Sequence, residues 1–107
     1  MEWKKFNGMI TVGLVKELYF IAHFLGTVVE TTLCVSTENG PSYPVRIYVS
    51  PDTALVDVWY KEEHIWSEHI EGATSFFGIE SCDTISRIIA CINNGSDWSQ
   101  YRWKENP

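Results

Sequence analysis

The chain has 107 residues, the usual size of one domain with one hydrophobic core, so we expect residues 1–107 to fold as a single unit. Hydrophobic residues make up 45% and charged residues 21%, which is the ordinary globular range and argues against a chain that stays unfolded. The formal charge of −6 argues against direct binding to nucleic acid or to an anionic membrane, and it favours a basic partner.

The cysteines and the apolar segments indicate the compartment. The three cysteines form an odd set without a CxxC pair: Cys34, Cys82 and Cys91. This pattern predicts neither a disulfide framework nor a zinc site. The longest apolar stretch, residues 10–25, carries Lys16 and Glu17 in its middle, and it is therefore unlike a membrane span or a signal-peptide core. We therefore expect a cytoplasmic protein with reduced thiols.

The predicted elements begin with a short edge strand at residues 1–6, which ends at the Asn-Gly turn of residues 7–8. A helix follows over roughly residues 11–25, because Thr11 can cap its start and Gly26 can end it. Its apolar face consists of residues at helical spacing: Leu14, Leu18, Ile21, Ala22 and Leu25, widened by Val15 and Tyr19. Phe20 and Phe24 fall outside that face. They either pack under a neighbouring strand, which is the commoner case, or are partly exposed.

Four strands follow, at residues 27–37, 43–49, 54–60 and 64–70, and short turns separate them. Short turns join antiparallel neighbours, so we expect a meander with one face on the helices and the other toward solvent or a partner. In the last of these strands, simple alternation places His64, Trp66, Glu68 and Ile70 on one side, opposite Ile65, Ser67 and His69.

A second helix is predicted from Ser81 or Cys82 to Asn93, with Ser81 or Asp83 as its cap and the Asn-Gly pair of residues 94–95 at its end. Its apolar stripe is rich in isoleucine: Ile85, Ile88, Ile89 and Ile92. We expect the aromatic tail that follows to add a last strand. The predicted fold class is therefore α+β, an antiparallel β-sheet of about four to six strands with two main α-helices packed on one face.

An acidic and aromatic segment is the candidate binding surface. Residues 52–83 hold eight carboxylates against Lys61 alone, a local charge of −7. Tryptophan anchors protein interfaces and carboxylates steer association, so this segment suits a basic protein partner. The alternatives are that the carboxylates form a solvated face and that one or both tryptophans belong to the core. The predicted partner-binding residues are Asp57, Trp59, Glu62, Glu63, Trp66, Glu68 and Glu71.

Signals for catalysis or for a bound metal are weak. The carboxylates of the acidic segment could include an acid/base pair, but residue types alone do not indicate one. His64 and His69 are an odd number of residues apart, so a regular strand directs them to opposite faces and only a bulge would bring them to one side. The sequence contains no GxSxG elbow, phosphate-binding glycine loop or Cys-His signature. We expect no catalytic residue, no metal and no cofactor.

The segment FFGIESCDTISRIIACINNGSDWSQYRW, residues 76–103, resembles the C-terminal part of a family of small bacterial immunity proteins. These neutralise polymorphic toxins, including those of contact-dependent growth inhibition systems. The shared pattern is the Ile-Glu pair at 79–80, an apolar helix, Gly95 and Trp103; the prolines common near the helix start and before the last tryptophan are missing here.

The resemblance implies an inhibitor, not an enzyme, that blocks a cognate toxin domain, often a nuclease. We expect it to occlude the toxin domain one to one, and we favour a monomer in the complex. One alternative is a phage- or plasmid-type inhibitor that acts as an acidic nucleic-acid mimic. The other is a small enzyme that uses a carboxylate pair.

Overall fold

The computed structural model describes residues 5–7, 10–35, 43–70 and 76–103. Its elements, in chain order, are β1 (Lys5–Asn7), α1 (Val12–Leu25), β2 (Val29–Val35), β3 (Tyr43–Val49), β4 (Leu55–Tyr60), β5 (Glu63–His69), α2 (Ile79–Asn94) and the short 3-10 helix η1 (Ser99–Tyr101). Two helices and a mostly antiparallel sheet confirm the predicted α+β class.

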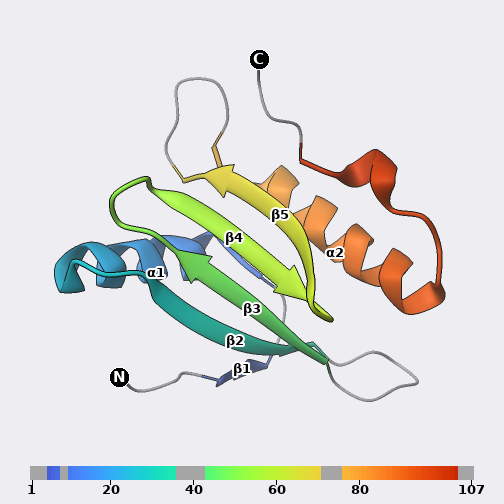
Figure 1. Ribbon diagram of the computed structural model, residues 1–107, viewed down its shortest axis with the longest axis horizontal. Helices are drawn as coiled ribbons and strands as arrows, with labels where there is room; N and C mark the ends of the chain where they lie inside the picture. Colours follow the sequence, from blue (N-terminus) through green and yellow to red (C-terminus); the bar gives the residue numbers. More distant parts are fainter. Residues whose placement is uncertain (1–4, 8–9, 36–42, 71–75, 104–107) are drawn as a thin grey trace.

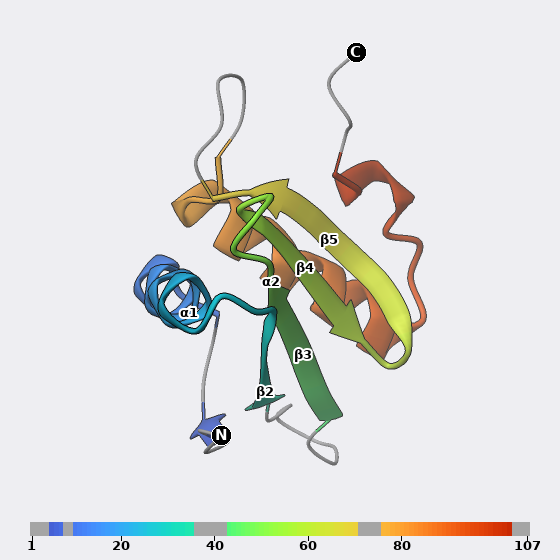
Figure 2. The same cartoon turned by 60° about the vertical axis from the view of Figure 1, so that its left-hand side comes forward.

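The strands form one sheet in the order β1-β2-β3-β4-β5 (Figure 1). Strands β2 to β5 are antiparallel neighbours, as the short turns predict. The exception is β1, which pairs with β2 in parallel because α1 carries the chain back to the end where β1 began. In Figures 1 and 2, α1 lies next to β2 and α2 next to β5, on the same side of the sheet.

The core lies between the sheet and the two helices. Strand alternation directs every second residue of β3 and β4 to this side, where the side chains are fully buried: Val45, Ile47, Val49, Val56, Val58 and Tyr60. The helices contribute their apolar stripes to the same cluster: Leu14, Val15, Leu18 and Ala22 from α1, and Ile85, Ile88 and Ile89 from α2. The opposite face of the sheet has no helix over it among the described residues.

The helix ends agree with the sequence prediction at three of four positions. The Thr11 hydroxyl accepts a hydrogen bond of 3.1 Å from the Leu14 amide at the start of α1, and Gly26 and Gly95 end the two helices with φ of 68° and 72°. Only the start of α2 differs, at Ile79 rather than Ser81 or Cys82. The Ser81 hydroxyl does not cap the helix because it donates to the Glu68 carboxylate of β5 instead.

The aromatic tail does not add the expected strand. The backbone amide and the hydroxyl of Ser99 donate to the Asp97 carboxylate, each at 3.0 Å, and this local bonding starts the 3-10 helix. Trp98, Tyr101 and Trp103 are half-buried and pack against the core cluster.

Phe20 and Phe24 are also placed against expectation. They do not pack under a strand, because α1 turns its stripe of leucine, valine and alanine toward the sheet and these two rings point away from it. Phe20 is 74% exposed and Phe24 is 83% exposed.

Candidate functional site: the uncovered sheet face

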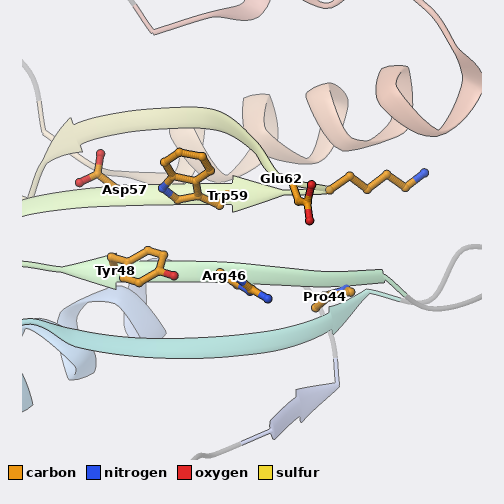
Figure 3. Close-up of a pocket in the computed structure, with 7 residues that line it drawn as sticks. Pro44, Arg46, Tyr48, Asp57, Trp59 and Glu62 are labelled. Carbon is orange, nitrogen blue, oxygen red and sulfur yellow. The ribbon is translucent and has the colours of Figure 1, made fainter.

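The uncovered face of the sheet carries a depression of ≈ 530 Å³ (Figure 3). It lies over β3, β4 and the turn that follows β4, where residues alternate with the buried core positions. Its lining combines two aromatic rings, a proline and four charged side chains: Pro44, Arg46, Tyr48, Asp57, Trp59, Lys61 and Glu62.

A β-bulge in β5 decides which side chains reach this face. Val58 is paired with Trp66 but the next residue, Trp59, is paired with His64, so Ile65 has no partner in the register. Because of the extra residue, His64 lies on the uncovered face with Trp59, and Trp66 lies on the core face, where it is 8% exposed.

The bulge also corrects the prediction for the two histidines. His69 is paired with Leu55, so both histidines lie on the uncovered face rather than on opposite faces. They remain far apart, since five residues of strand span roughly 15 Å. His69 contacts the Thr53 carbonyl oxygen at 3.0 Å, and His64 contacts Asp57. In the part of the chain that the structure describes, no group of His, Cys, Asp and Glu could hold a metal ion.

Trp59 is fixed in place by a stack of rings. The His64 ring lies 4.9 Å from the Trp59 ring at an angle of 15°, and Trp103 of the tail lies 4.7 Å from His64 on a tilted plane. The Asp57 carboxylate holds His64 through a contact of 2.8 Å between Oδ1 and Nε2. Trp59 is 38% exposed, so it presents an indole in a fixed orientation at the surface.

The charges around Trp59 are mixed. Arg46 is its register neighbour on β3, and within the described residues no hydrogen bond or ion pair holds the guanidinium. Lys61 lies with its Nζ 3.9 Å from the centre of the Tyr43 ring. Asp57 and Glu62 add two carboxylates, so the depression is far less acidic than the segment charge of −7 suggests.

The predicted partner-binding residues separate into three groups. Asp57, Trp59 and Glu62 line the depression, and Glu63 is exposed at the start of β5. Trp66 and Glu68 lie on the helix side of the sheet, which makes them part of the structural core and its border. These two are therefore not brought together with Trp59. The seventh residue, Glu71, lies outside the described residues.

Glu68 connects β5 to α2. Its Oε1 accepts a hydrogen bond of 3.3 Å from the Trp66 indole and another from the Ser81 hydroxyl. A carboxylate with two donors at the edge of the core supports the packing of the helix on the sheet.

Six residues of the site are absent from the sequence prediction: Pro44, Arg46, Tyr48, Lys61, His64 and Trp103. Alternation with Val45, Ile47 and Val49 already assigns Arg46 and Tyr48 to the outer face, so the signal for them existed. The positions of His64 and Trp103 depend on the bulge and on the path of the tail, neither of which has a local sequence signal.

Comparison with protein-family models, with curated proteins and with solved structures finds no match for this chain. Among the described residues, neither helix has the length and apolar character needed to cross a bilayer. Cys82 is buried and Cys91 half-buried in α2, both as free thiols, and burial raises the pKa of the Cys82 thiol.

Proposed function

We propose that this protein is a cytoplasmic immunity protein that binds a bacterial toxin domain with the uncovered sheet face and neutralises it by occlusion. The toxin domain is expected to be basic at its active site, as a nuclease is. The observation that carries the proposal is the exposed Trp59, stacked on His64, in the lining of a depression that also carries four charged side chains. The resemblance of residues 76–103 to immunity proteins supports the same reading.

An immobilised tryptophan is suited to anchor a protein interface. A large ring contributes much apolar contact area, and it loses little conformational freedom on binding when its neighbours already hold it. His64 stacks on Trp59, and Trp103 contacts His64 in turn. A partner seated on the sheet around Trp59 would exclude water from the contact. No cofactor is needed for this kind of inhibition.

The charges support specificity more than affinity. Asp57 is already paired with His64, so Glu62 and Glu63 at the β4–β5 turn are the carboxylates available to a basic partner. With the net charge of −6 they would steer association, whereas Arg46 and Lys61 require acidic or carbonyl groups in matching positions on the partner. This mixture suits a protein surface better than it suits mimicry of a uniform row of phosphates.

A charge-reversal experiment tests the orientation of the complex. We expect Glu62→Lys/Glu63→Lys to slow association with a candidate toxin domain from the same locus, and to weaken the salt dependence of the rate, because steering charges at the interface are lost. The matched control is Glu80→Lys/Asp83→Lys, which makes the same change of charge at exposed positions of α2 on the other layer. Stopped-flow kinetics at low and at higher salt measure the association rate and its salt dependence for both double variants. Equal slowing by the two double variants would reduce the effect to net charge and contradict the assignment of the face.

A further inference from the structure

The outer side of α1 and the segment after it expose a group of large apolar side chains. Phe20 is 74% exposed, Phe24 83%, Leu25 49% and Val28 53%. We name these four residues the α1 patch. The two phenylalanines are four residues apart, so they lie side by side on one helix face.

The α1 patch is in the size range of the largest apolar patches that monomeric proteins expose. With roughly 200 Å² for a whole phenylalanine, the two rings alone expose roughly 300 Å², before Leu25 and Val28 are added. Contiguous apolar patches of about 300–600 Å² are the largest that monomers carry, and they commonly mark an interaction site. The patch is not a defect of core packing, because α1 already buries a complete apolar stripe against the sheet.

The polar surroundings argue against a lipid surface as the occupant. Helices that lie on membranes carry several Lys or Arg residues on their polar face. Here α1 offers Lys16 and, beside it, Glu17, and the chain as a whole has a charge of −6. An anionic bilayer would repel such a protein.

We propose that the α1 patch is the interface of a homodimer in which the α1 helices of two copies pack antiparallel across a two-fold axis at the level of Ala22. About this axis Phe20 lies opposite Phe24 of the second copy, since each is two residues from it. The symmetric pairing places four phenylalanine rings at the centre, where aromatic side chains pack favourably against one another.

The rest of the patch fits the same arrangement. Lys16 and Glu17 are exposed about one turn before Phe20, so polar side chains border the apolar centre as in ordinary interfaces, and Val28 follows Gly26, which ends the helix. A standard interface buries about 800 Å² per partner, somewhat more than half of it apolar. The α1 patch supplies most of that apolar share, and we expect a dimer of micromolar affinity.

The dimer is independent of the proposed function but compatible with it. Helix α1 lies on the helix side of the sheet, so the depression around Trp59 stays open in both copies (Figures 1 and 2). Each chain could still bind one toxin domain, and the dimer would bind two. The complex with a monomer that the sequence analysis favours would then be half of a symmetric assembly.

Sedimentation velocity over roughly 1–100 µM, a range suited to a weak dimer, tests the proposal. We expect the mass to rise with concentration from 12.3 kDa toward twice that value, and Phe20→Glu/Phe24→Glu to raise the dissociation constant at least roughly tenfold. The matched control is Phe76→Glu, which charges another exposed phenylalanine, 66% exposed and outside the patch, and should leave the dimer intact. Circular dichroism checks that both variants are folded.

Three results would overturn the proposal. The first is a mass of 12.3 kDa at every concentration. The second is self-association that the double variant does not weaken or that Phe76→Glu weakens equally. The third is binding of the monomer to phosphatidylcholine vesicles that Phe20→Glu/Phe24→Glu abolishes, because that would make a lipid surface the occupant.

Discussion

Tyr60 joins the sheet to the end of α2. Its side chain is fully buried at the ring, and its hydroxyl donates a hydrogen bond of 2.6 Å to Oδ1 of Asn93. Burial, the largest contribution, raises the pKa of Tyr60 above its ordinary value of 10.0. The native fold therefore favours the neutral phenol. Its contribution to stability is complete below pH 10 and is lost as the pH rises through the raised pKa.

Replacing this tyrosine tests the linkage. We expect Tyr60→Phe to lower the free energy of unfolding by about 1 kcal/mol at pH 7, because Asn93 loses its partner. Above pH 10 the difference in the free energy of unfolding between wild type and variant should shrink. The wild type is then destabilised because its fold opposes ionisation of Tyr60, whereas the variant has no phenol to ionise. Urea unfolding from pH 7 to the alkaline limit measures this. Tyr48→Phe, on the uncovered face, is the control, and a difference that stays constant with pH would contradict the argument.

Trp59 and Trp66 show why the face of a single strand residue cannot always be predicted from alternation. Sequence reasoning left open whether Trp59 and Trp66 were surface or core residues, and the structure assigns one to each. The difference comes from the unpaired Ile65, which shifts the alternation of β5 by one residue. Nothing in the local sequence marks that bulge, because Ile65 is an ordinary strand residue. Asp57, by contrast, lies on β4, where alternation is regular, and its face follows from the sequence.

At the scale of elements, the β4–β5 turn stores backbone strain beside the site. Lys61 and Glu62 have φ of 50° and 65°, the left-handed pair of a two-residue hairpin turn for which Asn and Gly are the usual residues. A side chain with a Cβ in that region costs roughly 1 kcal/mol or more. Glu62 lines the depression, so a residue suited to binding occupies a position that favours glycine.

Replacing Glu62 should separate stability from binding. We expect Glu62→Gly to raise the free energy of unfolding by about 1 kcal/mol, because glycine relieves the backbone strain at this position. We also expect it to slow association with the toxin domain, because the carboxylate is lost. Ala54→Gly is the matched control: Ala54 also has a positive φ, 52°, but it lies in the β3–β4 turn outside the depression. It should stabilise without affecting association. Loss of stability in both variants would contradict the strain argument.

The elements themselves were predictable where caps and periodicity act locally. Thr11, Gly26 and Gly95 correctly predict three helix ends, and alternation correctly predicts which residues of β3 and β4 face the core. The start of α2 could not be predicted because Ser81 bonds to Glu68, thirteen residues earlier in another element. The parallel pairing of β1 is equally a tertiary feature, since it depends on the return path through α1.

At the scale of the whole molecule, the acidic segment is divided among different surfaces. Asp57 and Glu62 line the depression, Glu68 is directed to α2, and Glu80 and Asp83 are exposed on the helix layer. A contiguous run in sequence is not a contiguous face, because a meander with a bulge distributes it over both sides of the sheet. We therefore expect partner binding at the uncovered face to depend on Trp59 and its ring stack rather than on a local charge of −7.

The proposed toxin-binding face is tested by calorimetric titration of a candidate toxin domain from the same locus with wild type and Trp59→Ala. We expect one chain per toxin domain, a dissociation constant on the order of nanomolar for the wild type, and a loss of about 2–4 kcal/mol of binding free energy in the variant. Circular dichroism must first show that the variant is folded. Trp59→Ala binding as tightly as the wild type would contradict the claim that the uncovered sheet face is the toxin-binding surface.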